Sequence, residues 1–217
     1  MFLTKDNRIK WWSLAIGTLV TFALVVCGML WFDIPVFNFL RRFNCGFFDV
    51  LGDVFTVKNW LILSFLVMLV FYVKKSLDIR PRIGITDFLD KVKNSYAFYV
   101  FCSVLCAGIV GGVLKLIIGR GRPIFYEALN MTGFVHFSTE WAFNSMPSGH
   151  TFASFAGLVV IGLLAPRVRW FTWGLATVIG ISRVCVGAHW PSDVILGAFI
   201  GMVAADVVKS VLARHIK

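Results

Sequence analysis

Residues 96–118 read YAFYVFCSVLCAGIVGGVLKLII, and this stretch decides the class of fold. It carries a single charge, Lys115, close to its end. Because about 20 apolar residues in a helix cross the hydrocarbon core of a bilayer, it predicts a transmembrane helix. The whole chain agrees: 59% of its 217 residues are hydrophobic and its mean hydropathy is +0.83, too apolar for an ordinary water-soluble core.

Five further apolar runs flank this helix, and two of them are close to the minimum spanning length. The six runs are residues 11–32, 60–73, 96–118, 147–165, 171–187 and 194–212. Backbone groups in lipid must be satisfied within their own segment, so the runs predict an all-α, polytopic membrane protein with six transmembrane helices. We expect one membrane-embedded domain, residues 1–217, with its motif-bearing core at about 96–213.

Lys and Arg residues set the predicted orientation, because cytoplasmic flanks retain positive charge. If the N-terminus is cytoplasmic, fourteen of the 21 Lys and Arg residues lie in cytoplasmic segments. These segments are residues 1–10, 74–95, 166–169 and the C-terminal tail. Both termini are therefore predicted to be cytoplasmic. The first run lacks a small-residue cleavage pattern after Leu30 and is interpreted as an uncleaved anchor.

The net charge of +10 is spread over loop ends without an extended basic face. This pattern argues against nucleic acid and favours anionic lipid headgroups in a bilayer as partners. No obligatory protein partner is expected. The five cysteines show neither a disulfide framework nor metal-ligand spacing, so no metal and no cofactor are expected.

Two segments between the runs have distinct compositions. Residues 33–58 mix phenylalanines with charges, which predicts a helix lying in the membrane interface, either as a packing linker or as part of a substrate entry. Residues 119–146 form the longest outside loop. Seven tryptophans lie at or near run ends, where indole rings favour the headgroup zone: Trp11, Trp12, Trp31, Trp60, Trp170, Trp173 and Trp190.

Three polar clusters interrupt this apolar chain, and the predicted topology places all three at the outer membrane face. The clusters are Lys115 with Arg122 and Pro123; Pro147, Ser148, Gly149 and His150; and Ser182, Arg183, His189 and Asp193. Clusters scattered by chance over six helices would be divided between the two faces. Charged groups at membrane depth are costly and generally mark function.

Each cluster has a use if the ligand is a phosphate. Arg122 and Arg183 can offer planar donor forks and Lys115 a point charge to phosphoryl oxygens. Ser148 and Gly149 lie where a helix should begin, and free backbone N–H groups there point at an anion. Taken singly, each has a simpler explanation, since a lysine can snorkel and a Ser-Gly pair can form a turn.

Two histidines are candidates for catalysis. His189 and Asp193 are four residues apart, so on a helix they share a face, and the carboxylate can accept from one imidazole nitrogen. His150 can then exchange a proton with the reacting oxygen. The spacing does not decide which histidine attacks phosphorus. Arg120 and Glu127 are interpreted as structural or peripheral.

These residues resemble the signature of the type 2 phosphatidic acid phosphatase family. The three motifs read KLIIGRGRP from Lys115 to Pro123, PSGH from Pro147 to His150, and SRVCVGAHWPSD from Ser182 to Asp193, in the family's order and spacing. The resemblance covers about the C-terminal half of the chain.

The resemblance implies a metal-independent reaction in which His189 is the nucleophile, Asp193 its partner and His150 the general acid. It also implies phosphate binding by six residues: Lys115, Arg122, Ser148, Gly149, Ser182 and Arg183. The family includes soluble vanadium haloperoxidases, which the apolar spans argue against here. Its bacterial members include phosphatases of undecaprenyl diphosphate, phosphatidylglycerol phosphate and lipid A 1-phosphate.

We therefore expect a lipid phosphate or diphosphate phosphatase in a bacterial inner membrane, with its site facing the periplasm and a phosphohistidine intermediate. Two alternatives remain open at this point. A phosphotransferase would share the first step and pass the phosphoryl group to another lipid. A transporter or lipid-binding protein would bind in the basic pocket without turnover.

Overall fold

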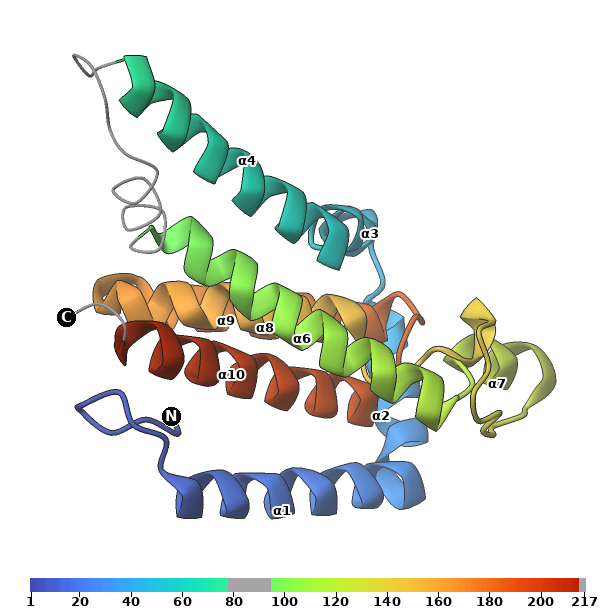
Figure 1. The fold of residues 1–217 in the computed structure, drawn as a ribbon. Helices are drawn as coiled ribbons and strands as arrows, with labels where there is room; N and C mark the ends of the chain where they lie inside the picture. The colour runs from blue at the N-terminus through green and yellow to red at the C-terminus, as the bar shows by residue number, and fades with distance from the viewer. Residues whose placement is uncertain (78–94, 215–217) are drawn as a thin grey trace.

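The computed structural model describes residues 1–77 and 95–214, most of which are helical (Figure 1). Six helices are long: α1 Trp11–Cys27, α4 Val57–Leu77, α6 Tyr96–Ile118, α8 Gly149–Leu164, α9 Arg169–Cys185 and α10 Pro191–Arg214. Three are short: α2 Asp33–Leu40, α3 Gly46–Val54 and α7 Pro123–Leu129. A π-helical turn, Gly28–Phe32, joins α1 to α2. Single 3-10 turns occur at Arg41–Phe43, Trp141–Phe143 and Pro166–Val168.

The described residues contain no β-strand beyond two isolated bridges, so the all-α prediction is confirmed. Each of the six apolar runs coincides with one long helix. Among the described residues, however, only three helical stretches are long and apolar enough to cross a bilayer: Trp11–Phe43, Tyr96–Ile118 and Pro191–Ala213. A fourth span results if α3 and the first part of α4, bent by 54°, are one broken span. Length and composition thus support three or four spans.

Helix α8 lies at the centre of the bundle and packs against α6, α9 and α10. It is only 16 residues long, and small side chains such as Ala153 and Ala156 are fully buried on it. Helix α10 approaches it through Gly197, where a Cβ atom would lie 2.9 Å from the Ser148 carbonyl oxygen. Close packing inside the bundle therefore explains this glycine.

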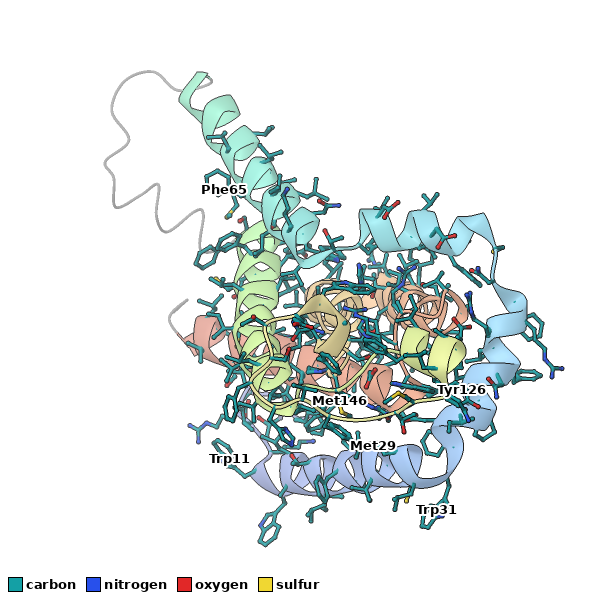
Figure 2. All side chains as sticks on the ribbon, turned by 90° about the vertical axis from the view of Figure 1, so that its right-hand side faces the viewer. Trp11, Met29, Trp31, Phe65, Tyr126 and Met146 are labelled. Carbon is teal, nitrogen blue, oxygen red and sulfur yellow. The ribbon has the colours of Figure 1, made fainter. Side chains whose placement is uncertain are left out.

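The outer helices carry the most exposed apolar surface. Helix α1 packs on α10, and α4 packs mainly on α6 and leans away from the bundle at its far end (Figure 1). Trp11 of α1 and Trp31 of the following π-helical turn are more than two-thirds exposed and project outward (Figure 2). Trp60 and Trp190 are instead buried, and their rings pack on neighbouring aromatic side chains.

The predicted interfacial helix at residues 33–58 is in fact two short helices, α2 and α3, separated at Asn44 and Cys45, which have extended backbone. Helix α3 packs on α9 through Leu51 and Gly52, while Phe47 remains exposed. The cytoplasmic loop predicted at residues 74–95 lies for the most part outside the described residues.

The two ends of the bundle differ. At one end the last turns of α6 and α9 meet the first turns of α8 and α10, with α7 beside them (Figure 1). At the other end the chain's first residues lie beside the last turns of α10, where the Phe2 N–H donates to Asp206 Oδ2 at 2.8 Å. The polar motifs therefore gather at the end opposite the N-terminal segment.

Candidate active site

The loop that follows α6 turns sharply and directs two arginines into the end of the bundle. Gly119 has φ +61°, and a Cβ atom there would overlap the Val135 carbonyl, so glycine is required. The Arg122 N–H then donates to the Ala142 carbonyl at 3.0 Å. Arg120 and Arg122 are separated by one residue in this loop, but their side chains have different neighbours.

The imidazole of His189 is fully enclosed and faces a carboxylate. Its Nδ1 lies 3.7 Å from Asp193 Oδ2. The Ser145 hydroxyl lies between them, donating to Asp193 Oδ2 at 2.5 Å and standing 3.5 Å from His189 Nδ1. All of these contacts use Nδ1, so Nε2 is the candidate nitrogen for attack on an electrophile.

The sequence had suggested that His189 and Asp193 share one helical face, which the structure corrects. Helix α10 begins only at Pro191, so His189 precedes it and Asp193 stands in its first turn. Proline at a first helical position is favoured because its missing N–H has no partner there. The Trp190 N–H donates to Asp193 Oδ2 at 2.9 Å, which closes the turn between them.

Burial keeps the His189 imidazole neutral. Burial lowers the pKa of His189 to about 3; the nearby Asp193 carboxylate raises this pKa, and the charges of Lys115 and Arg122 lower it. A neutral imidazole has a nitrogen lone pair available for attack on an electrophile.

Lys115 and Arg122 contact mainly backbone oxygens. Lys115 Nζ donates to the Asn144 carbonyl at 2.6 Å. Arg122 donates from Nη1 to the Ala188 carbonyl at 2.9 Å, and its guanidinium lies 4.2 Å over the Trp141 ring. Burial lowers the pKa of Arg122 to about 10, although the charge of Asp193 raises it. Positive charge that is bonded to neutral carbonyls favours a bound anion.

Arg183 is held by the end of its own helix and by α3. Its Nε donates to the Ser182 hydroxyl at 3.1 Å, and its Nη2 donates to the Phe48 carbonyl. The Ser182 hydroxyl in turn donates to the Ile179 carbonyl at 2.7 Å. A Cβ atom at Gly52 would overlap the Arg183 guanidinium, so α3 sits directly against this cation. Ser182 therefore acts here as a support for Arg183.

The first turn of α8 brings His150 to the same place. The ring centroids of His150 and His189 are 6.5 Å apart, and His150 Nδ1 is buried without a hydrogen-bond partner among the described residues. Ser148 caps this helix, and its N–H donates to the Asp193 carbonyl at 3.0 Å. Its hydroxyl accepts from Thr151 at 2.9 Å. Gly149, the first residue of α8, lies against Lys115, since a Cβ there would be 3.8 Å from Lys115 Cε.

The structure thus brings all nine sequence-derived site residues to one end of the bundle. The space between the two histidines, the cations and the N-terminus of α8 suits a phosphoryl group, because cations and free helix N–H groups both favour negative charge. No group of three or more His, Cys, Asp or Glu side chains that could hold a metal is found among residues 1–77 and 95–214.

Sequence reasoning missed part of this site. Arg120, interpreted as structural or peripheral, donates to Asp193 Oδ1 at 2.8 Å and to Asp33 Oδ2 at 2.7 Å, and is buried. Glu127 is peripheral, pairing with Arg41 at 2.7 Å. One signal was present: Asp33 is the only acidic residue between residues 11 and 48, and a carboxylate in so apolar a stretch calls for a partner.

Comparisons with known proteins identify relatives of this chain. The sequence profile described as the PAP2 superfamily matches residues 96–217. A lipid A 1-phosphatase of Rhizobium johnstonii is 32% identical over 202 residues, which cover 90% of this chain and 79% of the relative. A lipid A 1-phosphatase of Rhizobium etli is 42% identical over 103 residues, but these cover only 44% of that relative.

The crystal structure of Aquifex aeolicus LpxE shares the fold, with a TM-score of 0.51 at 20% identity over 81% of this chain and 93% of that one. The fold is that of an all-α membrane protein whose motif residues gather around His150 and His189 at one end of the bundle. From the profile match and the Rhizobium johnstonii relative, the chain belongs to the PAP2 superfamily.

Proposed function

We propose that this chain hydrolyses the phosphate or diphosphate end of a membrane lipid through a phosphohistidine on His189, with a lipid A 1-phosphate as the leading substrate. The chain is a lipid phosphatase of the PAP2 superfamily. The observation that carries the proposed mechanism is the neutral His189, oriented through Nδ1 by Asp193 and Ser145, beside cations that are bonded to carbonyl oxygens.

In the first step the lone pair of His189 Nε2 attacks phosphorus. The N–P bond forms as the P–O bond to the lipid breaks, and the departing oxygen takes a proton from His150. The negative charge of the arriving phosphate favours the protonated form of His150. Asp193 and Ser145 stabilise the positive charge that develops on the His189 ring.

In the second step water attacks the phosphohistidine. His150 accepts the proton from water, the N–P bond breaks, and inorganic phosphate leaves with both histidines restored. Lys115, Arg122 and Arg183 stabilise the charge on the phosphoryl oxygens in both transition states, and the N–H groups at Gly149 and His150 add helix-terminal donors. Ser148 and Ser182 contribute to phosphate binding indirectly: Ser148 caps α8, and Ser182 supports Arg183.

We propose further that all six long helices cross the membrane, with both termini in the cytoplasm of a bacterial cell and the site at the periplasmic face of the inner membrane. The gathering of the site at the bundle end opposite Phe2 supports this placement, as does the charge distribution. Helices α8 and α9 are short, with 16 and 17 residues, and α8 is the inner member of the bundle. We treat residues 1–217 as one domain.

Substrate choice is supported by the Rhizobium johnstonii relative, a lipid A 1-phosphatase that aligns over 90% of this chain. The test is phosphate release by purified protein in detergent with EDTA, offered lipid A, undecaprenyl diphosphate, phosphatidylglycerol phosphate and phosphatidic acid. We expect fastest release from the 1-position of lipid A and none from His189→Ala. Faster release from another lipid would overturn the substrate, and equal release by His189→Ala would overturn the mechanism.

Labelled water separates hydrolysis from the two alternatives. Hydrolysis places one oxygen from ¹⁸O water in each released phosphate. Transfer to a second lipid releases no inorganic phosphate and yields a newly phosphorylated lipid, and a binding protein gives neither product. Either of these last outcomes contradicts the hydrolase.

A further inference from the structure

A buried ionic network adjoins the candidate catalytic pair through Asp193. Asp33, the first residue of α2, accepts from the Ser192 N–H at 2.8 Å and from the Ser192 hydroxyl at 2.5 Å. The Arg120 guanidinium donates from Nη2 to Asp33 and from Nη1 to both Ser192 and Asp193. All four side chains are buried.

Asp33 caps the helix that carries Asp193. The Ser192 N–H is one of the first N–H groups of α10, which have no partner inside the helix. A carboxylate there satisfies the donor and interacts favourably with the helix dipole. The close approach is made possible by Gly28, in the π-helical turn before α2, where a Cβ would lie 2.8 Å from Ser192 Cβ.

The two oxygens of Asp193 have separate tasks. Oδ1 accepts from Arg120 at 2.8 Å, whereas Oδ2 accepts from Ser145 and faces His189. With Oδ1 fixed, the carboxylate cannot rotate Oδ2 away from the histidine. Burial alone would lower the pKa of Arg120, but the Asp193 and Asp33 carboxylates raise it above its ordinary value, so the network stays charged.

We propose that Asp33 and Arg120 are positioning residues that fix the carboxylate of Asp193 against His189, so that the N-terminal helices, which lie outside the matched 96–217 region, are part of the catalytic apparatus. Asp33 acts through α10 and Arg120 through Oδ1 of Asp193. Neither is bonded to the phosphate-facing cations. The inference rests on the proposed function of His189.

The test is a comparison of kcat and KM for Asp33→Asn and Arg120→Gln with the wild-type protein. At metal sites, loss of the partner that orients a ligating side chain costs about 10- to 100-fold in activity, and we take the same scale for the orientation of His189. We expect kcat to fall by that much while KM stays within about twofold, since the lost interaction orients the attacking group and does not bind phosphate.

A matched control is available on the same helix. Asp206 is a buried carboxylate of α10 that accepts a backbone N–H, from Phe2, at the opposite end of the bundle. Asp206→Asn should leave kcat unchanged. If Asp206→Asn lowers kcat as much as Asp33→Asn, or if Asp33→Asn raises KM at constant kcat, the positioning role is wrong.

A double-mutant cycle tests whether Asp33 works through Asp193. In an Asp193→Asn background, Asp33→Asn should lower kcat by less than about twofold, because the group it positions is already lost. Independent, multiplying losses would contradict the inference. If Arg120→Gln does not fold, Asp33→Asn and Ser192→Ala carry the test, since each keeps the Arg120–Asp193 pair.

A readout without turnover separates this inference from the proposed function. If the wild-type protein releases no phosphate, the proposed function fails, and ¹⁵N NMR of His189 still decides the positioning role. The expected wild-type signature is the tautomer with hydrogen on Nδ1, and Asp33→Asn should shift it toward a mixture. An unchanged tautomer in Asp33→Asn would overturn the inference.

Discussion

Arg120 and Arg122 are separated by one glycine in the motif GRGRP, yet they differ in every contact. Arg120 is bonded to two carboxylates, which raise its pKa despite burial. Arg122 donates to the carbonyls of Trp141 and Ala188, and burial lowers its pKa to about 10. The comparison teaches that a cation paired with carboxylates is already neutralised and contributes to the stability of the fold. A cation bonded to neutral carbonyls keeps its positive charge and can bind an anionic substrate.

The largest expected effect is on the stability of Arg120→Gln. Removing one partner of a buried ion pair leaves uncompensated charge and costs about 3–5 kcal/mol, and here two carboxylates lose their partner. Thermal or denaturant unfolding in detergent measures this loss. Arg122→Gln, the matched variant, should cost clearly less. Equal losses of stability in Arg120→Gln and Arg122→Gln would contradict a structural role for Arg120 that Arg122 lacks.

Arg122→Gln should instead affect the reaction. Loss of one preorganised donor to a developing charge lowers kcat by about 100- to 1000-fold. Arg122→Lys should recover only part of this, because a lysine lacks the planar fork that matches a phosphate. Phosphate release by the folded variants measures both. Near wild-type kcat in Arg122→Gln would contradict an anion-binding role for this residue.

The third prediction concerns pH and His189. Its pKa is about 3 when folded, against about 6.5 in an unfolded chain, so between these values the unfolded state binds a proton that the folded state does not. His189 therefore lowers stability as pH falls from about 6.5 toward 3. The stability lost between pH 7 and pH 4.5 should be smaller in His189→Asn than in wild type.

Two variants sharpen this pH experiment. His136→Asn, in the exposed part of the 119–146 loop, should lose as much stability as wild type over the same interval. Lys115→Met should raise the pKa of His189, because one of the positive charges that lower it is removed. An identical pH dependence in wild type and His189→Asn would show that His189 is not held neutral by burial.

The smallest expected effect comes from α3. A methyl group in Gly52→Ala would overlap the Arg183 guanidinium, so Arg183 must shift and its contribution to phosphate binding should weaken. We expect KM to rise by about two- to fivefold, a loss of up to about 1 kcal/mol in binding, because the guanidinium is displaced and not removed. Gly46→Ala, at a position with open space, is the control. Unchanged KM in Gly52→Ala would mean that Arg183 does not bind the substrate from this position.

Much of the fold could be predicted from the sequence because the apolar runs are long and local. Residues 96–118, for example, form α6 with the predicted bounds. The prediction of one continuous helix at residues 33–58 was wrong, since the packing of α3 on α9 depends on tertiary contacts. Six spanning segments also exceed what length and composition support, because short helices such as α8 pack inside the bundle.

The site was predictable where its residues lie in short motifs and not where partners are distant. Lys115, His150 and His189 stand in recognisable spacings. Asp33 joins Ser192 across 159 residues of chain, so no local pattern could have paired them. The partners of Trp190 are distant in the same way: its indole N–H donates to the Gly121 carbonyl and its ring packs on Phe37.

The central claim is that His189 carries the phosphoryl group, and trapping the intermediate tests it most directly. Protein mixed with lipid labelled with ³²P in its phosphate and quenched within one turnover should carry an acid-labile, base-stable label. That label should be absent from His189→Ala and should persist longer in His150→Ala, because His150 activates the water that removes it. Label that remains in His189→Ala, or phosphate release without any labelled protein, would contradict the account.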